Sequence, residues 1–119
     1  MSFSNFGVSE TVNAQKTKEA VNYIHENYPN VVIDGEVQAD FALNPELLEK
    51  EFPFSKLNGK KVNTLIFPNL ESANITYKLM KELNEALSIG PILMGLSEPI
   101  HVLQLGASVD EIVNMAAVA

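Results

Sequence analysis

Cysteine and arginine are both absent from this chain of 119 residues. The lack of cysteine excludes disulfides, thiolate metal sites and cysteine nucleophiles, and it is compatible with a reducing cytoplasm, where we expect the protein. Arginine is the residue that holds phosphate or carboxylate groups through two parallel hydrogen bonds. Any phosphate-handling chemistry here must therefore use lysine, helix N-termini or another chain.

Positive charge and long apolar runs are also scarce. Eight lysines oppose fifteen acidic residues, which gives a net charge of −7. Nucleic-acid binding needs a basic stripe, so we expect no nucleic-acid partner. No apolar run approaches the length of a membrane span, and the first residues lack the basic and apolar regions of a secretory signal. We therefore expect no membrane partner.

Apolar residues make up 46% of the chain, and the length suits one compact domain with a core. Helical patterns cover residues 10–28, 45–52, 69–83 and 108–119. Strand-like apolar runs cover residues 31–33, 62–67, 89–94 and 100–103. Strands that alternate with helices are typical of an α/β fold, so we predict a parallel sheet in α/β/α layers.

The helix starts carry clear local signals. Asn44 precedes a proline at the first helical position, and Asn69 precedes the apolar stripe of the next helix. Ser108 and Glu111 form a capping box, in which each side chain accepts from the backbone of the other residue. Ser9 is a further candidate N-cap. The last helical pattern reaches the end of the chain without a stop signal, so we expect a piece of a larger fold.

Two patterns resemble binding motifs but favour simpler interpretations. Gly90 and Gly95 have the glycine spacing of a phosphate loop, but Leu96 stands where that motif needs lysine. A strand whose glycines allow close packing and a turn is the better interpretation. His25 and His101 have no partner at metal-ligand spacing, so we predict no metal site.

Two charged residues leave alternatives open. Lys78 lies on a polar helix face, either as a solvated residue paired with Glu82 four positions on, or as a contact for an anionic ligand. Glu111 is explained as the acid of the capping box, and a catalytic role is the alternative.

A series of blocks in a fixed order covers nearly the whole chain: residues 2–7, 34–40, 42–47, 65–70, 73–79, 89–95, 99–104, and 106–108 with 110–115. Together they resemble the phosphotransacetylase family, and especially the phosphotransacetylase-like C-terminal domain of bacterial hybrid NADP-dependent malic enzymes. The resemblance implies the isocitrate/isopropylmalate dehydrogenase-like phosphotransacetylase fold. It also implies that residues 1–119 are a truncated C-terminal portion of that domain.

The same resemblance bears on chemistry. Active phosphotransacetylases carry Asp-Leu-Ser-Arg-Gly where this chain has residues 102–106, so their serine and arginine correspond to Gln104 and Leu105. A downstream catalytic aspartate corresponds to Glu111. We therefore predict no catalytic residue. The resemblance implies that any surviving acetyl-CoA site is lined by Lys78, Gly90, Pro91, Gln104, Gly106 and Glu111.

The resemblance, with Gln104 and Leu105 in place of the family serine and arginine, implies a catalytically silent module for regulation and oligomerisation, of an acetyl-CoA-sensing type. Its parent would be a hybrid malic enzyme that oxidatively decarboxylates malate to pyruvate. The alternatives are a fragment of a true phosphate acetyl/butyryltransferase, which moves acyl groups between coenzyme A and phosphate, and a stand-alone binding protein. The resemblance implies NADP and a divalent metal, Mg or Mn, in the parent and no cofactor here. The expected partners are the rest of the parent chain and other copies in a homo-oligomer.

Overall fold

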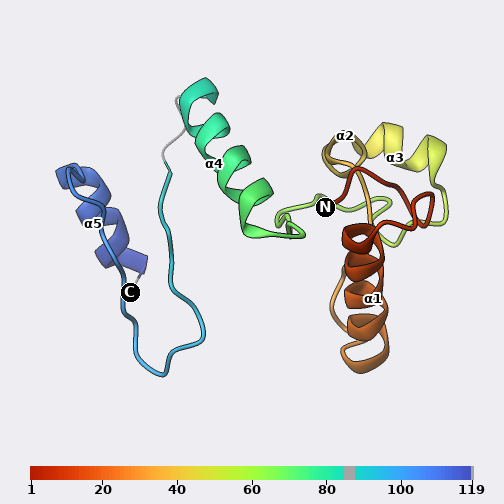
Figure 1. Cartoon of the computed structure of the whole chain (residues 1–119), viewed down its shortest axis with the longest axis horizontal. Coiled ribbons are helices and arrows are strands. Elements are labelled where there is room, and N and C mark those ends of the chain that lie inside the picture. The colour runs from red at the N-terminus through yellow and green to blue at the C-terminus, as the bar shows by residue number, and fades with distance from the viewer. Residues whose placement is uncertain (85–87, 119) are drawn as a thin grey trace. The chain divides into compact units, whose positions relative to one another are not determined.

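The computed structural model describes residues 1–84 and 88–118, and the chain divides into two compact units, Met1–Ile75 and Thr76–Ala119. Figure 1 shows the helices of these ranges. They are α1 (Val12–Asn27), α2 (Ala39–Leu43), α3 (Pro45–Glu51), α4 (Leu70–Asn84) and α5 (Val109–Val118). No helix in the described ranges is long and apolar enough to cross a membrane.

The predicted parallel sheet is wrong for this structure. Residues 31–33, 62–67, 89–94 and 100–103 run without helix, but no strand is formed in the described part of the chain. A strand exists only where a second strand accepts and donates its backbone hydrogen bonds. The apolar runs indicated segments suited to burial, but they carried no information about a pairing partner.

Two of the predicted strands instead border a hollow in the first unit. Residues 31–34 and 62–66 line it together with the α1 side chains Val21 and Ile24, and its volume is about 680 Å³. The amino group of Met1 donates a hydrogen bond to the Ile66 carbonyl at its edge. The apolar runs thus face a common space without forming a ladder.

Local signals placed the starts of α3 and α4 correctly. The Asn44 side chain accepts a hydrogen bond from the Leu47 amide at 3.1 Å, and proline follows at the first helical position. Asn69 Oδ1 accepts from the Ser72 amide at 2.9 Å. Each side chain satisfies an amide that the helix itself leaves without a partner.

The start of α1 and the presence of α2 were not predicted. Thr11, not Ser9, precedes α1, and its side chain makes no capping hydrogen bond. α2 has five residues and packs with α3. Such a short helix has too few apolar positions to show a helical period in the sequence.

The core of the first unit gathers around α2 and α3. Its buried apolar residues are Val37, Ala42 and Leu48. The Phe52 ring lies beside this cluster and contacts Phe6 and Phe41, with ring centroids 4.9 and 5.0 Å away. Tilted and edge-on aromatic pairs of this kind add to the stability that burial provides.

Two acidic residues in the block at residues 34–40 accept hydrogen bonds from distant parts of the first unit. Asp34 accepts from the Ser55 hydroxyl at 2.9 Å and the Lys56 amide at 2.7 Å. Glu36, only 1% exposed, accepts from the Gly7 amide at 2.6 Å and the Ser4 hydroxyl at 3.3 Å. Both carboxylates connect distant loops, and Glu36 needs its donors because a buried acid must find hydrogen-bond partners.

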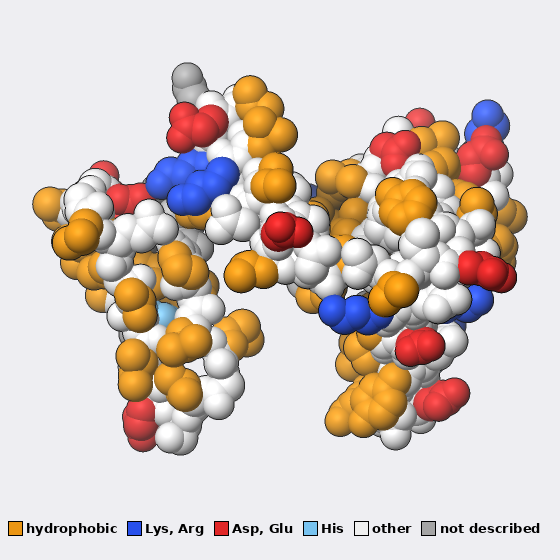
Figure 2. Space-filling model, in the orientation of Figure 1, with side chains coloured by type: hydrophobic (Ala, Val, Ile, Leu, Met, Phe, Trp, Pro, Cys, Tyr) orange, Lys and Arg blue, Asp and Glu red, His pale blue; other side chains and the backbone are white. Residues whose placement is uncertain are grey.

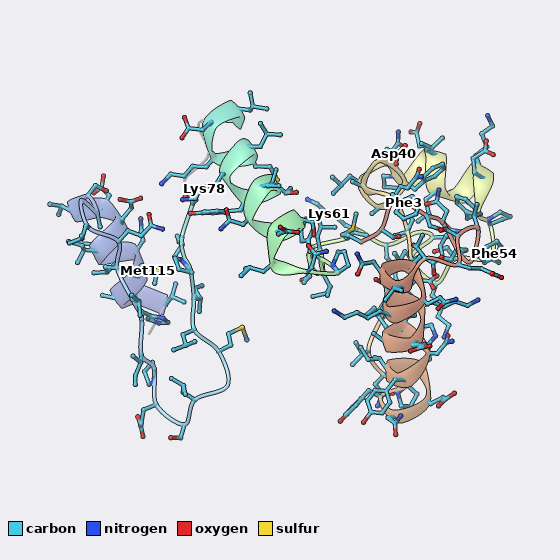
Figure 3. The ribbon with its side chains drawn as sticks, viewed as in Figure 1. Phe3, Asp40, Phe54, Lys61, Lys78 and Met115 are labelled. Atoms are coloured by element: carbon cyan, nitrogen blue, oxygen red, sulfur yellow. The ribbon has the colours of Figure 1, made fainter. Side chains whose placement is uncertain are left out.

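The second unit contains the C-terminal turns of α4, the extended segment 88–107 and α5. Its chain bends at Gly95 and at residues 97–98 before it returns to α5. Among the described residues of this unit, only Met115 of α5 is buried (Figure 3). Many apolar side chains of the unit are exposed, as the orange surface in Figure 2 shows.

Candidate functional site

A small pocket of about 150 Å³ lies within the second unit. α4 contributes Tyr77 and Lys81 to its wall, and α5 contributes Glu111 and Met115. The remaining wall is formed by Ser88, Gly90 and the segment 102–107. Two helix faces and the residues before α5 therefore converge on one space.

An ion pair crosses this pocket. Lys81 Nζ lies 3.2 Å from Glu111 Oε1, and both side chains are partly exposed. The hydrogen bond from Lys81 and the nearby Glu111 charge raise the pKa of the lysine above its ordinary value. Lys81 is thus a stable cation at the pocket wall.

Glu111 has a second set of contacts. Its Oε2 accepts from the Ser108 amide at 2.8 Å, and its own amide donates to Ser108 Oγ at 3.2 Å. The predicted capping box is therefore confirmed. The Ser108 hydrogen bonds and Lys81 together lower the pKa of Glu111, so this carboxylate is ionised and a weak base.

The structure brings four of the six predicted site residues to the pocket, namely Gly90, Gln104, Gly106 and Glu111. Lys78 and Pro91 are exposed and do not line it. Lys78 Nζ lies 5.5 Å from the centroid of the neighbouring Tyr77 ring, a cation–π distance, and Figure 3 shows its place on α4. The ligand-binding role of all six residues stays a prediction.

Sequence reasoning missed Lys81 as the cation of the pocket. The signal available was its position four residues after Tyr77, which places both side chains on one helix face. The partner Glu111 is 30 positions away, so no local sequence pattern could reveal the ion pair.

Leu105, which the sequence resemblance matches to the family arginine, does not fill the pocket. The Leu105 side chain is fully exposed, at 106% of its reference area, although the residue borders the wall. Gln104 also lies at the wall and supplies an amide group. Neither residue brings a charge or a nucleophile.

The histidines and acids of the described ranges do not assemble a metal site. No group of three His, Cys, Asp or Glu side chains lies together in residues 1–84 and 88–118. His25 Nε2 contacts the Ile33 carbonyl at 2.8 Å. These residues therefore do not fit the divalent metal that the resemblance implied for a longer protein.

The pocket admits only a small group. Its volume is about 150 Å³. That space suits a phosphate, a carboxylate or an acetyl group, but not an entire coenzyme A molecule.

Comparisons with known proteins identify the family of this chain. The family described as "Phosphate acetyl/butaryl transferase" matches residues 1–119. An NADP-dependent malic enzyme of Haemophilus influenzae is 40% identical over 119 residues, which is 100% of this chain and 16% of that enzyme. A phosphate acetyltransferase of Treponema pallidum is 45% identical over 106 residues, 89% of this chain and 31% of that protein.

A solved structure supports the same family assignment. The EutD phosphotransacetylase from Staphylococcus aureus superimposes with a TM-score of 0.86 at 35% identity, over 97% of this chain and 36% of that chain. This chain belongs to the phosphate acetyl/butaryl transferase family. The resemblance found in the sequence is therefore confirmed, with malic enzymes and phosphate acetyltransferases both among its relatives.

Proposed function

We propose that this chain is a non-catalytic part of a longer, malic enzyme-type protein, where it senses a small acyl or phosphate group and supports assembly. The chain spans 16% of the length of the Haemophilus influenzae malic enzyme that it matches. The chemistry of malate oxidation, with NADP and a divalent metal, would then belong to other sequence. The parent would act in the cytoplasm.

The observation that supports this proposal most strongly is the lack of a charged side chain at residues 104 and 105 of the pocket wall. Acyl transfer to phosphate requires charge stabilisation of the transferring group, which usually contributes much of the rate. Gln104 offers only an amide, and the Leu105 side chain points into solvent. Neither position supplies a positive charge for a phosphate in the transition state.

The remaining charged groups of the pocket are already engaged. Lys81 is paired with Glu111, and Glu111 also accepts from the Ser108 amide. A general base works best when its pKa lies near the operating pH, whereas the pKa of Glu111 is lowered. This arrangement supports binding without turnover.

The competing proposal is acyl transfer between coenzyme A and phosphate. The 45% identity to the Treponema pallidum phosphate acetyltransferase favours it, and so does Glu111, which corresponds to the family aspartate. The two proposals differ in one measurable property, because only the second expects formation of acetyl-CoA.

Two assays on the purified chain separate the proposals. We expect no acetyl-CoA from acetyl phosphate and coenzyme A, and weak binding of acetyl-CoA in calorimetry, because the pocket holds only the end of that molecule. Clear turnover would contradict the non-catalytic proposal. Submicromolar binding of acetyl-CoA would contradict the view that the pocket contacts only a terminal group.

A further inference from the structure

We infer that Lys81 is the anion-binding residue of the pocket, and that Glu111 occupies the anion's place as an internal carboxylate until an external phosphate or carboxylate group displaces it. The inference deepens the proposed sensing function and rests on it. It assigns the ligand class and the group that competes with the ligand.

The Glu111 carboxylate makes the contacts that a bound anion would make. One carboxylate oxygen accepts from Lys81 Nζ at 3.2 Å, and the other accepts from the Ser108 amide at 2.8 Å. A cation and a backbone amide that converge on two oxygens are the partners that phosphate and carboxylate ligands take in proteins. The Glu111 carboxylate thus occupies the two donors, Lys81 Nζ and the Ser108 amide, that an external anion would use.

The pocket beside the pair has room for the replacement. It measures about 150 Å³ and is bordered by Lys81, Glu111 and residues 102–107. The space accepts a phosphate or carboxylate group, whereas the rest of a larger ligand would remain outside. The partly exposed ion pair opens at small cost, because such pairs are weak in water.

Lys81 is favoured over Lys78 by position. Both lysines belong to α4, but only Lys81 lines the pocket, and Lys78 lies against the Tyr77 ring. Glu82 adds a further negative charge near Lys81, so the lysine remains charged when Glu111 leaves. The two lysines therefore provide a matched pair for experiment.

The experiment uses the full chain and four variants: Lys81→Met, Lys81→Gln, Lys78→Met and Glu111→Gln. Inorganic phosphate, acetate and coenzyme A are titrated separately at constant ionic strength, and the backbone amide signals of residues 104–111 are followed by NMR. Glutamine at position 111 can still serve in the capping box, so this variant removes the competing charge and keeps the helix start. Circular dichroism checks that each variant keeps its helices.

We expect Glu111→Gln to bind phosphate up to about fivefold more tightly, the size of a released exposed ion pair. Both Lys81 variants should lose the phosphate response, whereas Lys78→Met, which removes the same charge, should keep it. Acetate should give a weaker response at the same amides, and coenzyme A should respond through its phosphates. Retention of coenzyme A binding alone in the Lys81 variants would place those phosphates elsewhere and overturn the inference.

Equal losses in Lys81→Met and Lys78→Met would mean general charge attraction and would also overturn the inference, as would no phosphate response in any form. If Lys81→Met loses helix, the phosphate binding of Lys81→Gln and Glu111→Gln tests the inference instead. Failure of the proposed function has a different readout, because it appears as acetyl-CoA formation and not as a change in phosphate binding.

Discussion

Lys81 of α4 and Glu111 of α5 lie 30 positions apart in the sequence, yet Nζ and Oε1 are separated by 3.2 Å. Glu111 also holds the first turn of α5 through Ser108. One carboxylate therefore links a helix start to a second helix. The same residue also lines the pocket of the second unit.

The stability of α5 should fall in acid. The pKa of Glu111 is lowered in the folded chain, first by the Ser108 backbone hydrogen bond and then by Lys81. Its contribution is present above the ordinary glutamate pKa and is lost as pH falls through the lowered value. The pKa of Lys81 is raised, so its contribution is lost only as pH rises through that raised value.

Circular dichroism at 222 nm between about pH 2 and pH 7 measures the acid effect, in a range set by ordinary carboxyl pKa values. Glu111→Gln should remove part of the acid dependence, and Glu49→Gln, at an exposed position of α3, should leave it unchanged. Identical acid profiles for the wild type and Glu111→Gln would contradict the linkage.

Asn44→Ala should destabilise the first unit by about 1 kcal/mol, because the Leu47 amide loses its capping acceptor. Asn22→Ala, at an exposed position inside α1, serves as the control and should change stability by less than about 0.5 kcal/mol. Urea unfolding of both variants gives the comparison. An equal effect of the two substitutions would show that the Asn44 cap is without consequence.

Leu48→Ala should cost about 2–5 kcal/mol, because it opens a cavity beside Val37 and Ala42. Leu48 is 2% exposed, whereas Leu43, two positions before the start of α3, is 60% exposed. Leu43→Ala should therefore have a much smaller effect. Denaturant titrations of the two variants measure the difference, and similar losses would mean that the core lies elsewhere.

The chain should self-associate. Leu83 of α4 and Val109, Ile112 and Val113 of α5 are exposed, and large exposed apolar patches are uncommon on soluble monomers. Light scattering should report a dimer or a higher oligomer, and Val113→Lys should shift the population toward monomer. A monodisperse wild-type monomer at high concentration would contradict the assembly role.

The starts of α3, α4 and α5 could be predicted because their signals are local. Asn44, Asn69 and the Ser108–Glu111 capping box each act within three residues, and all three were found in the structure. Strand pairing depends on a second segment, so the apolar run at residues 62–67 could not reveal that it lacks a partner strand. The sheet was therefore wrong although the family was right.

The residues that line the pocket were also predicted only in part. Gly90, Gln104 and Gly106 were found through family blocks, and they do line the pocket. Lys78 was chosen as the cation because it lies on a polar face, but the sequence could not show which lysine meets Glu111. That choice depends on how α4 and α5 pack, which a local pattern does not encode.

The central claim is that residues 102–107 of this family member do not support acyl transfer. The most direct measurement places this segment at the matching position of the Treponema pallidum phosphate acetyltransferase and assays acetyl-CoA formation. A second chimera that carries residues 45–51, which form α3 outside the pocket, is the control. We predict that the first chimera folds and loses turnover while the control retains it; full turnover in the first chimera would contradict the account.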